Sequence, residues 1–182
     1  DWSSDVCSSD LDLIPSKKAL TVAEVNMLIE RQDDCLDKLL SPLRCDYDYI
    51  LVDTGPSLGS LTINAFTAAD GIMIPFDAEL FALVGLKELT DTISKIKQNL
   101  NPKVEITGIF FTKCSKRTTL YREISEQVHA AFGHLHIFES RIPATVKVGS
   151  ANSKGLSVME LDAKNEASIA YMNLAKEVLA NA

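Results

Sequence analysis

One acidic residue, Asp53, stands where an apolar run meets a turn, and its position suggests chemistry. Residues 50–52 (Ile-Leu-Val) precede it, and residues 54–57 (Thr-Gly-Pro-Ser) follow. A short apolar run bounded by turn residues is typical of a strand buried on both faces of a parallel sheet. Ligands of open α/β sheets bind just beyond the carboxyl ends of such strands. A carboxylate there can hold a hydrated Mg²⁺ beside phosphates, so the segment predicts a nucleotide-handling site.

Asp53 also has a structural interpretation, because Asp is a good N-cap for the helix expected next. Ser57 lies nearer the expected helix start and suits that position better, which leaves Asp53 free to face the ligand edge. Spacing alone leaves both interpretations open. The Gly55-Pro56 pair is likewise either a tight turn or a rigid switch that senses a γ-phosphate.

Two further loops follow expected strands, and we expect them to open on the same edge as Asp53. The first contains Thr112 and Arg117 and leads into a helix whose N-terminus would face anions. The second follows Pro143 and contains Lys147. Each is either an ordinary solvated loop or a contact with nucleotide or DNA phosphates.

Strand-like and helix-like patterns alternate along the chain. Short apolar runs predict strands at residues 13–16, 49–52, 71–75, 104–112 and 137–142. Apolar residues at helical spacing predict helices at residues 21–40, 58–69, 79–100, 118–132 and 165–180. Strands that alternate with long helices indicate βαβ units. The expected fold class is therefore α/β, with a mainly parallel sheet flanked by helices.

Composition limits the function classes. No apolar run approaches the roughly 18–20 residues that a membrane span requires. The four cysteines and three histidines lack metal-type spacing, and the cysteines indicate either free thiols in a reducing cytosol or core filler. The net charge is −7, yet residues 113–154 hold seven bases and three acids. That basic segment is either a nucleic-acid footprint or an ordinary surface with clustered lysines.

The first eleven residues need separate treatment. They carry no periodicity and resemble the translation of a common sequencing adapter. The alternative is a genuine polar tail. We expect residues 1–11 to be a non-native artefact and native sequence to begin near Asp12.

Several segments together resemble the ParA-type partition ATPases. They are residues 13–16, 47–59, 61–65, 68–70, 74–75, 81–86, 117–118, 141–143 and 170–178. The likeness covers nearly all of residues 12–182 in the same order, which is more specific than any single motif. It implies a deviant P-loop NTPase fold of the Rossmann-like kind, incomplete at the N-terminus. Residues 12–182 would be the C-terminal two-thirds of a single ATPase domain.

The resemblance also implies a function, which is ATP hydrolysis for plasmid or chromosome partitioning. Members of the family form homodimers when ATP is bound, bind DNA without sequence preference and are stimulated by a ParB-type partner protein. ATP and Mg²⁺ are the implied cofactors. The implied location is the cytoplasm, in association with the nucleoid, and no membrane partner is expected.

Roles carry over to individual positions. Asp53 matches the Walker B-type catalytic acid that holds Mg²⁺ through water, and Thr54, Gly55 and Pro56 match the switch that reports the γ-phosphate. Pro143 lies where the family's adenine-side loop passes the base, and Arg117 and Lys147 lie where members place basic residues that contact DNA phosphates. Thr112 is a further candidate for nucleotide binding, because of its place after an expected strand.

The chain departs from the family pattern in three places. Its turn reads Thr-Gly-Pro where many members have Cys-Pro-Pro, and Ala144 stands where an arginine is common. The family's Lys-Gly-Gly-x-Gly-Lys-[Ser/Thr] loop occurs nowhere in the sequence. Without it the phosphates lack a backbone N–H cradle and a lysine. We expect these 182 residues alone neither to bind ATP tightly nor to hydrolyse it.

Two alternatives remain from other function classes. A MinD-type positioning ATPase acts on membranes through a basic amphipathic C-terminal helix, and no such extension follows the last expected helix here. A non-enzymatic α/β regulatory module would gain support if the complete gene also lacked the P-loop.

Overall fold

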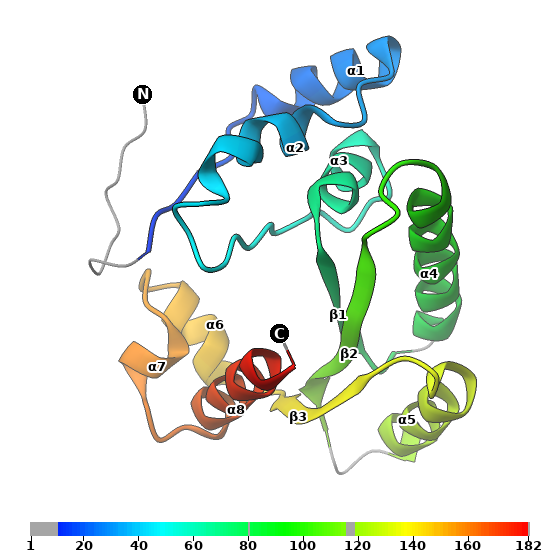
Figure 1. Ribbon diagram of the computed structural model, residues 1–182. Coiled ribbons are helices and arrows are strands. Elements are labelled where there is room, and N and C mark those ends of the chain that lie inside the picture. The colour runs from blue at the N-terminus through cyan, green and yellow to red at the C-terminus, as the bar shows by residue number, and fades with distance from the viewer. Residues whose placement is uncertain (1–10, 80, 116–118, 182) are drawn as a thin grey trace. The chain divides into compact units, whose positions relative to one another are not determined.

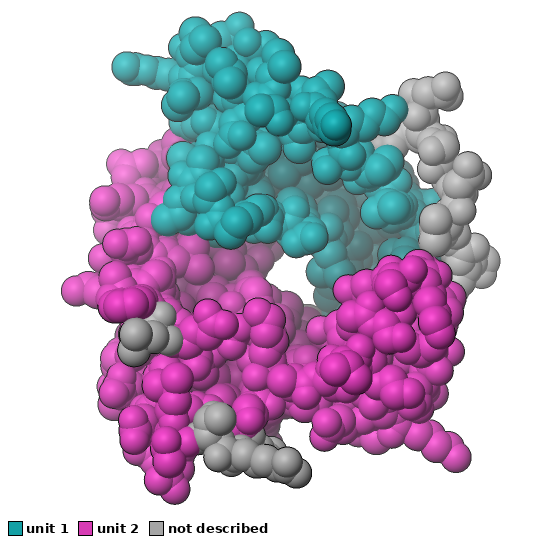
Figure 2. All heavy atoms as spheres, turned by 180° about the vertical axis from the view of Figure 1, so that it is seen from behind, with its two compact units in different colours: residues 1–68 teal, residues 69–182 magenta. Residues whose placement is uncertain are grey.

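The computed structural model describes residues 11–79, 81–115 and 119–181. The chain divides into two compact units, residues 1–68 and 69–182, drawn in teal and magenta in Figure 2. The boundary falls between helix α3 (Ser60–Ala68) and strand β1 (Gly71–Asp77), both labelled in Figure 1.

Unit 1 contains α1 (Leu20–Glu30), α2 (Cys35–Leu40), a 3₁₀ turn (Ser41–Leu43) and α3. The single helix predicted over residues 21–40 is therefore two helices. Arg31 adopts a left-handed backbone (φ 53°), and its N–H donates to the Met27 carbonyl to end α1. Residues 30–34 are all polar, so no apolar side chain holds the chain in a helix there.

Asn64 on α3 ties this unit together. It is 2% exposed, and its Nδ2 donates to the carbonyls of Gln32 (2.8 Å) and Ser60 (3.0 Å). Its Oδ1 accepts from the N–H of Leu36 at 3.3 Å. A buried amide is stable only when its hydrogen bonds are made, so Asn64 fixes the α1–α2 link against α3.

The strands predicted at residues 49–52 and 13–16 are wrong. Both segments are coil in the described part of the chain, and Leu51 is 88% exposed. A strand exists through hydrogen bonds to a neighbouring strand, and the described sheet contains only β1, β2 (Glu105–Cys114) and β3 (Ile137–Pro143). The apolar run before Asp53 therefore has residues typical of a strand, but no neighbouring strand pairs with it among the described residues.

Unit 2 confirms the predicted parallel α/β architecture. Its strands lie in the order β1-β2-β3, and both pairs are parallel. The helices are α4 (Ala82–Asn99), α5 (Thr119–Phe132), α6 (Val146–Asn152), α7 (Val158–Leu161) and α8 (Glu166–Ala180). In Figure 1, α4 and α5 lie on one side of the strands and α8 on the other.

Close packing between β2, β3 and α8 forms one core of unit 2. Phe138 is fully buried against Ile142 and Leu174, and burying one such aromatic side chain stabilises the fold by roughly 2–3 kcal/mol. Gly108 permits this packing, because a Cβ there would lie 2.6 Å from the Phe138 ring. The glycine is thus explained by the close approach of a neighbouring strand.

Glu177 attaches α8 to the outer edge of β3. Its carboxylate accepts hydrogen bonds from the N–H groups of Glu139 (2.8 Å) and Ser140 (2.9 Å) and from the Ser140 hydroxyl. Partial burial raises the pKa of Glu177, but these hydrogen bonds outweigh it and hold the pKa below its ordinary value. The carboxylate also occupies edge donors that another strand would otherwise use.

Candidate functional site

Asp53 lies in an exposed coil of unit 1. Thr54, Gly55 and Pro56 are exposed as well, and residues 50–59 form no helix or strand. The end of this segment is anchored where the Thr62 hydroxyl of α3 donates to the Ser57 carbonyl at 2.7 Å. Because α3 begins only at Ser60, the expectation that Ser57 occupies the N-cap is wrong.

The exposed Asp53 carboxylate suits a hydrated Mg²⁺. Magnesium keeps several waters and is usually held by one or two carboxylates together with substrate phosphates. Among the residues that the structure describes, no group of three or more His, Cys, Asp or Glu side chains forms a metal cluster. Asp53 thus fits the limited role of a carboxylate that meets the ion through water beside phosphate oxygens.

Thr112 and Pro143 lie near the carboxyl ends of β2 and β3 in unit 2. Asp77 pairs with Thr112 in the β1–β2 register, and Cys114 pairs with Pro143 in the β2–β3 register. The Ala144 N–H donates to the Cys114 carbonyl at 3.1 Å, which ties the loop after β3 to the end of β2. The two predicted nucleotide-side residues therefore share the edge at which parallel sheets bind ligands.

An ion pair that the sequence did not reveal stands at the same edge. Lys113 Nζ lies 2.8 Å from Asp77 Oδ2, and Lys113 adopts a left-handed backbone with φ 49°. The hydrogen bond and charge of Asp77 raise the pKa of Lys113 above its ordinary value. A left-handed backbone is unusual for lysine and is typical of ligand-binding edges. Only strand pairing could have shown that these two residues meet.

The predicted DNA-contacting residues differ in what the structure shows. Arg117 lies outside the described residues. Lys147 lies in the first turn of α6, which Thr145 caps by accepting the Lys147 N–H at 3.2 Å. The Lys147 ammonium is 3.5 Å from the Asp162 carboxylate, and its side chain is 48% exposed. It can reach a phosphate, but Asp162 competes for it.

Arg141 is a third base of the basic segment with internal contacts. Its guanidinium carbon lies 4.3 Å from the centroid of the fully buried Phe111 ring. Its Nη1 donates to the Phe138 carbonyl at 3.0 Å, and its Nη2 lies 3.4 Å from His129 Nε2. Since Lys113, Arg141 and Lys147 all have partners inside the protein, the surface is less basic than the residue count suggests.

Tyr121 and Cys114 complete the group around Phe111. The Tyr121 and Phe111 rings meet edge to face at 5.8 Å. Burial raises the pKa of Tyr121 to about 12, aided by Cys114 and opposed by Arg141. Burial also raises the pKa of the Cys114 thiol. We call Phe111, Cys114, Tyr121, His129 and Arg141 the Arg141 cluster.

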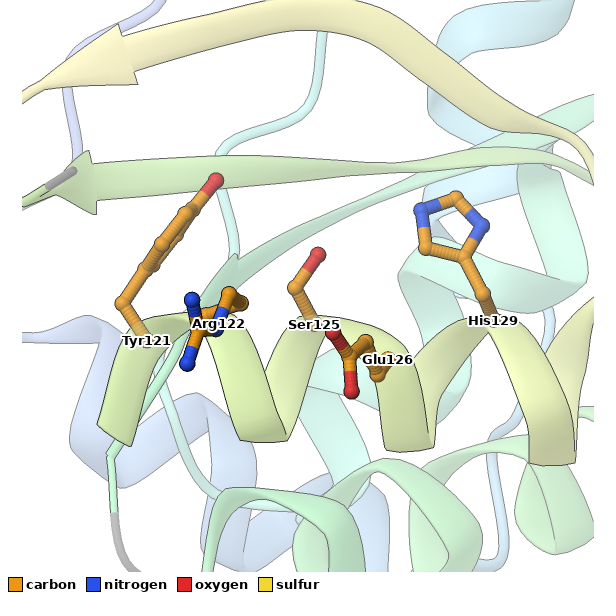
Figure 3. A pocket seen from close by; sticks show the side chains of 5 residues that line it. All are labelled: Tyr121, Arg122, Ser125, Glu126 and His129. Atoms are coloured by element: carbon orange, nitrogen blue, oxygen red, sulfur yellow. The ribbon is translucent and has the colours of Figure 1, made fainter. Parts of the chain in front are cut away.

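A hollow of about 400 Å³ lies along α5 next to this cluster. It is lined by Tyr121, Arg122, Ser125, Glu126 and His129, and Figure 3 shows Tyr121, Ser125 and His129 pointing from α5 toward the strands. A second hollow, of about 750 Å³, lies between α4 and α5. The first is lined by one helix alone, so it lacks the convergent walls of a nucleotide pocket.

Comparison with known proteins identifies close relatives. A protein-family model of the AAA domain matches residues 3–106. The chromosome-partitioning ATPase Soj of Treponema pallidum is 38% identical over 172 residues, covering 94% of this chain and 68% of Soj. The chromosome partitioning protein ParA of Caulobacter vibrioides is also 38% identical over 172 residues, covering 93% of this chain and 64% of ParA.

A solved structure extends the likeness to three dimensions. Cobyrinic acid a,c-diamide synthase from Mycobacterium smegmatis, solved with bound ADP and magnesium, is 29% identical with a TM-score of 0.76. The match covers 92% of this chain and 61% of that protein. The chain spans between 54% and 68% of the length of the curated relatives that it matches. Within the described residues, no helix is both long enough and apolar enough to cross a membrane.

Proposed function

The chain belongs to the ParA-type partition ATPases, and from this premise we propose that it is the C-terminal two-thirds of one ATPase domain that serves plasmid or chromosome partitioning. Residues 12–182 form that part. The observation that carries the proposal is the sequence similarity to two partition proteins, which extends over more than nine-tenths of the chain. The parallel sheet of unit 2 supports it, since this architecture places ligands at one edge.

In the proposed reaction, Asp53 orients the Mg²⁺ of bound Mg-ATP through water. The metal supplies charge stabilisation at the transferred phosphoryl group. Residues 54–56 form a short coil segment before α3. Pro56 restricts the backbone of this segment, so we expect a displacement at its start to be passed to α3. Thr112 and Pro143 lie on either side of the nucleotide at the edge of the sheet. The P-loop that cradles the phosphates would come from a segment before residue 12.

The proposal includes non-specific DNA binding by the ATP-bound homodimer, with Arg117 and Lys147 as phosphate contacts. Lysine and arginine that neutralise phosphates release counterions, which supplies most of the affinity of sequence-independent binding. Lys147 is exposed enough to take this role once Asp162 is outcompeted. A ParB-type protein is the proposed partner, and the nucleoid is the proposed location.

The test is DNA retention by the full-length protein with ATP and Mg²⁺. We expect Arg117→Glu combined with Lys147→Glu to weaken retention at low salt by about 50-fold, because two phosphate contacts are lost and two repulsions are gained. The matched control is Lys95→Glu combined with Lys103→Glu, which changes the charge equally at two exposed residues outside the basic segment. Equal retention by both double variants would refute the DNA-contact assignment.

A further inference from the structure

Arg141 has a contact pattern that exceeds what packing requires. Stacking on Phe111 fixes the plane of its guanidinium, and contacts at two nitrogens fix the rotation within that plane. An arginine that only filled space would keep its head group in solvent. Here the half-buried head group is held in one orientation between β2, β3 and α5.

The Arg141 cluster lies near the starts of two loops, one after β2 and one after β3, at the edge of the sheet where ligands bind. Arg141 comes just before Pro143, at the start of the loop that leads to Lys147 in α6. Cys114 ends β2, and Cys114 and Tyr121 bracket Arg117 in the sequence. The hydrogen bond from the Ala144 N–H to the Cys114 carbonyl connects the loop after β3 with the end of β2.

We propose that Arg141 is a positioning residue that holds the end of β2 and the loop after β3 as one unit, so that a nucleotide bound beside Pro143 and DNA phosphates bound near Lys147 influence each other's affinity. This inference rests on the proposed function for the identity of the two ligands. The mechanical link itself rests only on the contacts of unit 2. The guanidinium over the Phe111 ring joins the end of β3 to β2, and the Ala144 hydrogen bond joins the loop after β3 to the last residue of β2.

The chemistry of the cluster favours arginine at this position over lysine. A guanidinium stacks on an aromatic face while its edge donates in two directions, whereas an ammonium is a point charge without a plane. Arg141→Lys keeps the charge and loses the geometry. The Arg141→Lys variant therefore distinguishes a role that needs the geometry of the guanidinium from a role that needs only its positive charge.

The first experiment is amide hydrogen exchange on the 182-residue chain. We expect Arg141→Ala to accelerate exchange about tenfold both at residues 112–115 and at residues 143–147, the size of a lost charge-assisted hydrogen bond. Arg141→Lys should show most of the same increase. Arg122→Ala, an exposed arginine of α5 outside the cluster's contacts, is the control and should change neither segment.

Three outcomes would overturn the link. Faster exchange in one of the segments alone would mean that Arg141 does not couple them, and unchanged exchange would mean that it holds neither. Faster exchange spread evenly over unit 2, together with a lower urea midpoint, would show a role in global stability only.

The second experiment measures coupling in the full-length protein. We expect Arg141→Ala and Arg141→Lys to reduce the ratio of DNA retained with ATP to DNA retained without ATP by about tenfold, with the urea midpoint unchanged. Lys95→Ala is the charge-matched control. An unchanged ratio in both Arg141 variants would refute the coupling. If the unaltered protein shows no ATP-dependent retention, the proposed function fails, while the exchange experiment still decides whether Arg141 links the two loops.

Discussion

Lys147 is paired with an acid in the structure and is also a proposed DNA contact. Its ammonium lies 3.5 Å from the Asp162 carboxylate, and both side chains are more than one-third exposed. An exposed ion pair of this kind contributes at most about 1 kcal/mol, because water and salt screen it. The pair is therefore weak enough for a DNA phosphate to displace Asp162, yet its attraction must be overcome before Lys147 binds.

This competition predicts a substitution that improves binding. Asp162→Asn should strengthen DNA retention by the full-length protein about threefold at low salt, since the competing carboxylate is gone. Glu105→Gln is the matched control, because it removes one acid from another lysine ion pair, that of Lys97. Both variants should unfold at the same urea concentration as the parent. Equal gains in the two variants would show that overall charge, and not Lys147, sets the affinity.

At the scale of elements, Glu177 makes the attachment of α8 to β3 depend on pH. Because hydrogen bonds lower the pKa of Glu177 in the folded state, its contribution to stability is present above the unfolded value near 4.5 and is lost as pH falls through the lower folded value. The Glu177→Gln variant lacks this ionisation. Its free energy of unfolding should therefore fall less than that of the parent between about pH 5 and pH 3.

Urea unfolding at several pH values checks this prediction. The parent and Glu177→Gln should differ most at neutral pH, and their curves should converge in acid. Glu166→Gln, another α8 acid in the first turn, serves as the control for charge on this helix. Parallel pH curves for the parent and Glu177→Gln would contradict the role given to the carboxylate.

The sequence predicted the elements of unit 2 better than those of unit 1, for a physical reason. In unit 2 each apolar run has a paired neighbour, so β1, β2 and β3 form near the predicted residues. In unit 1 the same kind of run, residues 49–52, has no strand beside it among the described residues. Periodicity reports a preference for burial, and pairing decides whether a strand results.

Short helices and cross-strand contacts also escaped prediction. The helix α7 is too short to show periodicity, but the capping box formed by Ser157 and Glu160 could have revealed it. The Arg141 cluster could not be predicted, because its members come from β2, α5 and β3 and meet only through register. The part of the site that the sequence did place is the shared edge of Thr112 and Pro143.

At the scale of the whole molecule, these 182 residues contain only part of the proposed nucleotide site. The sequence contains Asp53 and lacks any Gly-rich loop that could cradle phosphates. We therefore predict that a fluorescent ATP analogue titrated into the 182-residue chain binds no tighter than ~1 mM, because a carboxylate without donors repels phosphate. Binding at micromolar concentration would show that these residues form a nucleotide site unaided.

The most direct test of the account is Mg²⁺-dependent ATP hydrolysis by the full-length protein and its Asp53→Asn variant. Asparagine keeps the size of the side chain and removes the charge that we propose meets the hydrated ion. The account predicts turnover that requires Mg²⁺ and falls about 100-fold in Asp53→Asn, with circular dichroism unchanged. Asp48→Asn, which alters another exposed acid of the same segment, should keep full turnover. Equal turnover in Asp53→Asn and the parent would contradict the account.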